Sequence, residues 1–253
     1  MNGLAVVLTA LQTAIGATAR APAPAYPFGI GERFDYTAKL GMLSLGSASI
    51  QVVGIDTVRG QPAWYFRFTL SGGGAIFKIV STLESWTSVR DFHSLRFRRD
   101  SKENNKQYLR DYEIFSDSGY YRQRQASATT PTTAEPLDDA SLLYFVRITP
   151  LKVGESHRLA RHFMPQHNPI VVNVLKRETI ELPDGTKVAA LVLNPIVGED
   201  KGLFGTRAEA RLWVTDDARR IPVQIRSRQP WGTITLRLDK MTPGTPVSRP
   251  GDG

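Results

Sequence analysis

The sequence WTSVRDFHSLRFR, at residues 86–98, recurs in altered form as WVTDDARRIPVQIR, at residues 213–226. Each copy begins with a Trp, passes through a polar turn that contains Asp and Arg, and continues with alternating apolar and polar residues. Such alternation is typical of a β-strand with one buried face. We expect Trp86 and Trp213 to be core anchors rather than ligand-binding groups, because large aromatic side chains are generally buried.

A Gly-Glu pair precedes each copy at a similar distance along the chain, as Gly31-Glu32 and as Gly154-Glu155. The repeated order of Gly-Glu pair, strands and Trp phrase predicts two similar β meanders. The Asp and Arg residues inside the phrases are assigned to turns, because an Asp side chain bonds readily to the backbone amides that follow it. The repeat therefore describes architecture and not a duplicated active site.

Strand patterns dominate the rest of the chain, and turn residues such as Gly, Pro and Asp-Gly interrupt them at short intervals. The predicted fold class is mainly β, with a strongly curved antiparallel sheet that is an open half-barrel or sandwich-like. One or two short helices are expected. The first covers residues 138–146, where two Asp residues precede an apolar run and favour the positive end of a helix dipole. The second covers residues 75–82.

The chain has 253 residues and contains no cysteine. Residues 1–25 contain a stretch of apolar and small residues followed by Ala-x-Ala sites, the pattern of a cleaved signal peptide, so the protein is expected in the periplasm. A single β domain is expected over residues 26–241, with repeat-like halves at about 28–125 and 150–241. The Pro/Gly-rich tail, residues 242–253, is predicted to be disordered.

The net charge of +8 comes from basic residues that are spread along the strand-like stretches. Such a surface is soluble and could attract lipid phosphates or acidic polymers. No nucleic-acid-binding motif is present, so nucleic acid is not an expected partner. The apolar stretch near the N-terminus is shorter than the roughly 20 residues of a membrane span, so membrane contact is expected to be peripheral at most.

Trp64, Phe66 and Phe68 are the candidate ligand-binding residues. Period-two alternation places them on one face of a strand together with Leu70. That face either packs in the core or lines a ligand cavity, and the usual burial of aromatic side chains favours the core.

Three histidines, His157, His162 and His167, are the candidates for metal binding. Their spacing of five places neighbours on opposite faces of a strand, and no Cys adds a ligand. We therefore expect scattered, exposed histidines, no metal and no cofactor.

No pattern of catalytic residues is evident. Ser44 and Ser47 lack the flanking glycines of a nucleophile elbow, and the glycines at 72–74 lack the Lys of a phosphate-binding loop. The carboxylates nearest to a catalytic pair are interleaved with arginines, which predicts cross-strand ion pairs. They are Glu84, Asp91, Asp111 and Glu113. The protein is therefore not expected to be an enzyme.

An ordered series of motifs runs through the chain. The first half contains GERFDY, LGSASI and FKIVSTLESW, and DDASLLYFVR, VGE, KRETIELPDGT, LWVTDDARRIPVQI and WGTITLRL follow. This series resembles the bacterial exported family called domain of unknown function 3108, over about residues 28–238. The family has no established catalytic residues, so the resemblance implies none here.

The second Trp phrase also resembles the Trp-x-x-Asp…Pro hairpin of periplasmic lipoprotein carriers. Those proteins are open β half-barrels whose concave face, closed by helices, holds acyl chains. Export, the curved sheet and the apolar stripe of Trp64, Phe66 and Phe68 together predict a non-catalytic envelope protein that binds or carries a lipid, acyl chain or other amphipathic component in a concave β cavity. The likeness to the carriers is one of fold and adds little to this prediction. The partner of the protein would be a lipid or lipoprotein. The alternative is a module that binds an envelope protein or polymer and has a packed core without a ligand pocket.

Overall fold

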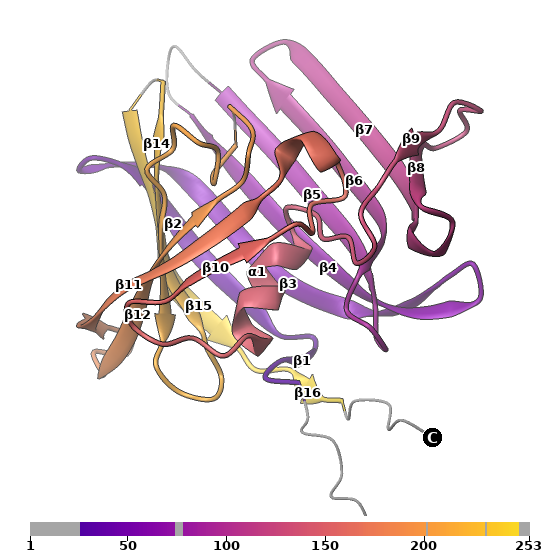
Figure 1. Cartoon of the computed structure of the whole chain (residues 1–253). Helices are drawn as coiled ribbons and strands as arrows, with labels where there is room; N and C mark the ends of the chain where they lie inside the picture. Colours follow the sequence, from indigo (N-terminus) through magenta and orange to yellow (C-terminus); the bar gives the residue numbers. More distant parts are fainter. Residues whose placement is uncertain (1–25, 74–77, 201, 231, 248–253) are drawn as a thin grey trace, which may run out of the picture.

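A single curved antiparallel sheet of fourteen strands dominates the structure and surrounds one helix (Figure 1). The computed structural model describes residues 26–73, 78–200, 202–230 and 232–247. The signal peptide predicted over residues 1–25 lies outside this part of the chain. The mainly β architecture, with an open curved sheet, confirms the predicted fold class.

The strands of the large sheet follow the chain in two series. They are β2 (Arg33–Leu40), β3 (Leu43–Val58), β4 (Gln61–Gly73), β5 (Lys78–Ser88), β6 (Ser94–Glu103), β7 (Lys106–Phe115), β8 (Tyr120–Gln123) and β9 (Thr130–Pro131), then β10 (Ser156–Leu159), β11 (Ile170–Glu181), β12 (Lys187–Ile196), β13 (Arg211–Thr215), β14 (Pro222–Gln229) and β15 (Gly232–Thr242). The helical elements are α1 (Ser141–Ile148) and the 3-10 turns η1 (Ser116–Ser118) and η2 (Pro165–His167).

Neighbouring strands in the sheet are consecutive in the chain, with one exception. Strand β15 pairs with β2, so that Leu236 lies opposite Ala38 and Leu238 lies opposite Tyr36. The spatial order therefore runs from β10 to β15 and continues from β2 to β9. Each half of the chain forms its own meander, and the β15–β2 pair joins the two.

The two meanders begin with the same backbone contacts. In each, the Gly of the Gly-Glu pair has a positive φ, 85° at Gly31 and 90° at Gly154. The Gly N–H donates to a Val carbonyl, the Val N–H donates to the Glu carbonyl, and the strand register shifts just after that Val. These bonds are Gly31 N to Val52 O (2.9 Å), Val52 N to Glu32 O (2.9 Å), Gly154 N to Val174 O (2.8 Å) and Val174 N to Glu155 O (2.9 Å).

The Trp residues of the repeat are also equivalent. The register shifts immediately after Trp86 in the β5–β6 pair and immediately after Trp213 in the β13–β14 pair. Each indole N–H donates to a carboxylate two strands back in the sheet, Trp86 to Asp56 (2.9 Å) and Trp213 to Glu178. The duplicated phrase therefore encodes a Trp, a β-bulge and a turn at corresponding places in both meanders.

Both Trp side chains are buried, but they lie on the face of the sheet that points away from α1. Trp86 lies opposite Tyr65 and stacks on its ring at 4.8 Å, whereas Trp64 points to the other face. Trp213 alternates with Leu212, which packs inward opposite Ile225. The prediction of buried anchors is confirmed: Trp213 belongs to the large core cluster, and Trp86 packs in a smaller cluster with Ala63 and Leu95.

Two sequence predictions fail in part. Residues 78–82 of the second predicted helix form the start of β5, because pairing with both β4 and β6 outweighs a short helical pattern. Residues 75–77 lie outside the described part of the chain. The tail is ordered at β16 (Thr245–Pro246), which pairs with β1 (Gly29–Ile30). A Cβ on Gly29 would lie 2.2 Å from the Thr245 carbonyl oxygen, so glycine allows this close approach.

Helix α1 is confirmed, and its first turn is defined by Asp138. The Asp138 carboxylate accepts hydrogen bonds from the N–H groups of Ala140 (2.9 Å) and Ser141 (2.8 Å). The three residues from 138 to 140 therefore form the turn that starts the helix. No helix in the described residues is long and apolar enough to span a membrane.

We expect Trp213→Ala to lower the free energy of unfolding by about 3–5 kcal/mol, through lost burial and a cavity. Trp213→Phe keeps most of the apolar contact and loses only the indole N–H, so it is expected to cost less. Urea unfolding of both variants measures the difference. An unchanged midpoint for Trp213→Ala would show that this Trp does not anchor the meander.

Candidate functional site

The aromatic face of β4 lies at the centre of the interior. Trp64 and Phe66 are completely buried, and Phe68 is 3% exposed. Two segments outside the large sheet cover this face: α1 and the residues that lead into β1 (Figure 1). We call these segments the cover. Neither of the two pockets described below is lined by Trp64, Phe66 or Phe68.

Contacts between the face and the cover are mainly aromatic. The Tyr144 ring of α1 stacks on Phe66 with centroids 3.8 Å apart. The Phe28 ring meets Trp64 edge to face at 5.2 Å, and it meets Tyr144 at 5.1 Å. Edge-to-face and stacked pairs of this kind add to the free energy of apolar burial.

Two polar groups are left without partners in this aromatic cluster. In the described part of the chain, neither Trp64 Nε1 nor the Tyr144 hydroxyl has a hydrogen-bond partner, although both atoms are buried. Burial also raises the pKa of Tyr144 well above its ordinary value, which keeps the hydroxyl protonated. An unsatisfied buried polar group costs about 1–3 kcal/mol, so these two atoms lie in unfavourable positions.

Arg147 holds the cover in place. Its guanidinium, which is buried, pairs with Glu32 and also donates to the carbonyls of Pro27 (2.9 Å) and Arg219 (3.0 Å). It lies 5.3 Å from the centroid of the Phe28 ring. One side chain therefore connects α1, the segment before β1, the Gly-Glu turn and the β13–β14 turn.

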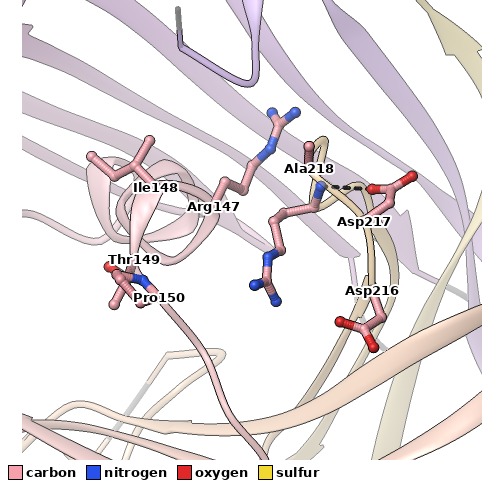
Figure 2. A pocket seen from close by; sticks show the side chains of 8 residues that line it. Arg147, Ile148, Thr149, Pro150, Asp216, Asp217 and Ala218 are labelled. Carbon is pink, nitrogen blue, oxygen red and sulfur yellow. Dashed lines mark hydrogen bonds between the residues drawn. The ribbon is translucent and has the colours of Figure 1, made fainter. Parts of the chain in front are cut away.

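A pocket of about 460 Å³ opens where the C-terminal end of α1 meets the β13–β14 turn (Figure 2). Its lining consists of Arg147, Ile148, Thr149, Pro150, Asp216, Asp217, Ala218 and Arg220. In Figure 2 the guanidinium of Arg147 points away from Thr149 and Pro150. A second pocket, of about 360 Å³, lies between β2, β15 and the end of β11.

Asp217 shapes the turn beside the first pocket. Its carboxylate accepts hydrogen bonds from the hydroxyl of Thr215 (2.7 Å) and the backbone N–H groups of Arg219 (3.0 Å) and Arg220 (3.1 Å). Although burial opposes ionisation, these bonds lower the pKa of Asp217. The structural role that the sequence predicts for this Asp is confirmed.

The histidines are not scattered and exposed, which corrects the sequence prediction. His162 is 2% exposed, its ring centroid lies 4.8 Å from that of His167, and its Nε2 lies 3.6 Å from an oxygen of Asp139. His157 lies apart, 3.7 Å from Glu155. Pro165 and the η2 turn bend the chain back between the two clustered histidines, which a strand spacing rule does not describe.

Glu199 belongs to the same polar cluster, which the sequence did not reveal. Burial raises the pKa of Glu199 to about 7, with a further contribution from repulsion by Asp139. His162 opposes the effect of burial at Asp139 and lowers the pKa of that carboxyl. Burial lowers the pKa of His167, and His162 adds to the effect. Among the described residues, no group of three or more His, Asp and Glu could hold a metal ion.

The interior side of β5 and β6 is lined with hydroxyl groups around Asp138. Ser85 donates to the Asp138 carboxylate at 2.6 Å, and Ser94 meets Ser141 at 3.1 Å. Burial raises the pKa of Asp138 to about 6, even though these bonds stabilise its charged form. The network positions the first turn of α1 against the sheet.

The carboxylates on the outer face form ion pairs, as predicted. Arg98 pairs with Glu84 at 3.0 Å, and Arg96 pairs with Asp111 at 2.7 Å. Glu113 pairs with Arg122 across the β7–β8 pair. Asp91 pairs instead with its neighbour Arg90 in the turn between β5 and β6, so the prediction of a cross-strand pair is wrong for this residue. Ser44 and Ser47, the serines considered as nucleophiles, lie exposed in β3.

A family model described as "Protein of unknown function (DUF3108)" matches residues 35–239. The chain belongs to the DUF3108 family. The match confirms the resemblance carried by the ordered motifs. No curated protein matches the chain.

Two solved structures are similar to this DUF3108 chain. One is the β-barrel-like protein of domain of unknown function DUF1849 from Brucella abortus, with a TM-score of 0.53 and 10% sequence identity over 86% of this chain and 99% of that one. This likeness shows a shared β-barrel-like fold. The hypothetical protein CT021 from Chlamydia trachomatis has a TM-score of 0.25 and 11% identity, over 87% of this chain and 92% of its own.

We expect Arg147→Met in this DUF3108 protein to lower the free energy of unfolding by about 3–5 kcal/mol, because it leaves Glu32 buried without a counter-charge. The double variant Arg147→Met/Glu32→Gln removes both charges and is expected to recover part of that loss. Urea unfolding of the two variants tests this coupling. Equal losses in the single and double variants would contradict it.

Glu199→Gln tests the polar cluster. A carboxyl with a raised pKa favours the folded state at low pH, and this contribution disappears as the pH rises from about 4.5 to about 7. We therefore expect Glu199→Gln to be more stable than wild type at pH 8, by about 1–2 kcal/mol after solvent screening. Urea unfolding at pH 5 and pH 8 measures this, with the exposed Glu155→Gln as control. An advantage that is the same at both pH values would contradict the assignment.

Proposed function

We propose that this protein is an exported, non-catalytic binding protein of the bacterial cell envelope. Its ligand is a lipid or another amphipathic molecule with an acyl chain. The acyl chain is held against the aromatic face formed by Trp64, Phe66 and Phe68 after the cover moves. The protein works in the periplasm and contacts the membrane only peripherally.

The observation that carries this proposal is the pair of unsatisfied polar groups at the boundary between the aromatic face and the cover. Trp64 Nε1 is a donor, and the Tyr144 hydroxyl can donate or accept. Both rings flank Phe28 and Phe66. An ester or amide carbonyl at the head of an acyl chain would give these donors the acceptor that they lack, while the chain itself keeps the apolar contacts.

The composition of the chain supports the same proposal. Residues 1–25 have the pattern of a signal peptide, and the net charge of +8 suits contact with anionic lipid surfaces. Because the cover consists of one helix and the segment that leads into β1, it can shift to admit a ligand between Tyr144 and the aromatic face without breaking the pairing of the large sheet.

A second candidate is a module that binds an envelope protein or polymer. The dense packing of Trp64, Phe66 and Phe68 favours it, because these side chains already have aromatic neighbours. The Thr/Pro loop at residues 127–136 contains β9, the last strand of the large sheet, and its residues 127–131 are exposed, so a partner strand or polymer could bind at this edge.

Native mass spectrometry of protein purified from membranes tests the first proposal, and it is expected to show bound lipid. Adding phosphatidylglycerol is expected to raise Tm by about 5–10 °C at a concentration a hundred times the Kd. The double variant Trp64→Phe/Tyr144→Phe should fold and lose most of this rise. Trp86→Phe, a matched change on the outer face, should keep it. Absence of both bound lipid and the Tm rise would reject lipid binding, and crosslinking in cells would then test the second candidate.

A further inference from the structure

Among the residues that the structure describes, the pocket between α1 and the β13–β14 turn contains one cation without a counter-charge. Arg147 in its wall is engaged with Glu32. Asp216 pairs with Arg177 on β11, and Asp217 pairs with Arg219 at 3.3 Å. Within the described residues, no carboxylate forms an ion pair with the remaining cation, Arg220.

Arg220 is partly withdrawn from solvent. Its Nη1 atom is buried, and in the described part of the chain it has no hydrogen-bond partner. The backbone N–H of Arg220 donates to Asp217 at 3.1 Å, which fixes the direction in which the side chain leaves the turn. A buried guanidinium donor without an acceptor is unfavourable, because it has lost water and gained nothing in return.

The backbone at this position adds to that cost. Arg220 has a φ of 49°, in the left-handed region that Gly or Asn occupies more easily. A turn that needed only its shape would therefore be better served by either residue. The strained position places a long, charged side chain in the wall of the pocket, which points to a role for the guanidinium itself.

We propose that this pocket binds an oxyanion, a phosphate or carboxylate group, through the guanidinium of Arg220. A guanidinium presents a planar fork of donors that matches the two oxygens of such a group. The neighbouring carboxylates do not repel the anion strongly, because each is neutralised by its own arginine. The oxyanion is either the head group of an amphipathic ligand or a small soluble anion.

Calorimetric titration with inorganic phosphate, at 150 mM NaCl to screen weak surface attraction, tests the site. Wild type is expected to bind, and Arg220→Gln is expected to reduce the affinity about tenfold or more, as for the loss of a charge-assisted hydrogen bond. Arg219→Gln is the matched control. It removes the same charge from the same turn, but from a side chain that is 60% exposed and paired with Asp217. The variant leaves Asp217 without its partner, but solvent screens this 42% exposed carboxylate, so a loss of less than about threefold is expected. Arg220→Lys keeps the charge without the fork and should give an intermediate value.

Cosedimentation with vesicles of phosphatidylcholine, with and without phosphatidylglycerol, identifies the source of the anion. A loss specific to Arg220→Gln with phosphate supports a soluble anion, and a loss specific to that variant with phosphatidylglycerol vesicles supports a lipid head group. Equal effects of Arg219→Gln and Arg220→Gln in both assays, or no binding by wild type in either, would overturn the proposal. Far-UV circular dichroism and urea unfolding confirm that each variant is folded.

This inference does not depend on lipid binding at the aromatic face. Trp64→Phe/Tyr144→Phe leaves the pocket intact and should bind phosphate as wild type does. Arg220→Gln leaves the aromatic face intact. Failure of the oxyanion site and failure of the proposed lipid function are therefore separate results.

Discussion

The buried ion pair between Arg147 and Glu32 is the constraint on which the rest of the interior depends. The two residues lie 115 positions apart in the chain, and the pair joins a helix to the first turn of the first meander. Removing two charges from water costs several kcal/mol, and only good geometry with further hydrogen bonds offsets that cost. Arg147 meets this condition through the carbonyls of Pro27 and Arg219. The position of the cover, and with it the closure of the aromatic face, follows from one guanidinium.

The same ion pair marks a difference between the two meanders. Both begin with a Gly-Glu pair that makes the same backbone bonds, so the main-chain role is common to Glu32 and Glu155. Their side chains have different surroundings: that of Glu32 is 11% exposed beside Arg147, and that of Glu155 is 48% exposed. Because α1 lies against only one of the two turns, the repeat is symmetrical in its backbone and asymmetrical in its interior.

The sequence predicted those features that depend on neighbouring residues. Period-two alternation located the strands, the recurring phrase located two equivalent Trp residues, and the acidic pair before residue 140 located the helix. The polar cluster could not be found in this way, because Asp139, His162 and Glu199 come from three separate connections. Glu32, the counter-charge of Arg147, could not be predicted either, because the two residues lie 115 positions apart in the chain. The helix prediction is wrong at residues 78–82, where a short pattern fits both the helical and the strand period and pairing with two neighbouring strands decides the outcome.

The β15–β2 pair has a consequence for how the chain reaches its native state. The strands of the first meander can pair with one another as soon as they have been synthesised. One edge of β2, however, stays without a partner strand until β15, near the C-terminus, is available. Open strand edges invite pairing with other chains, and contacts between distant residues form slowly. Until β15 pairs with β2, the first half of the chain therefore has an unpaired strand edge that other chains can bind, and the β15–β2 pairing removes this risk of aggregation.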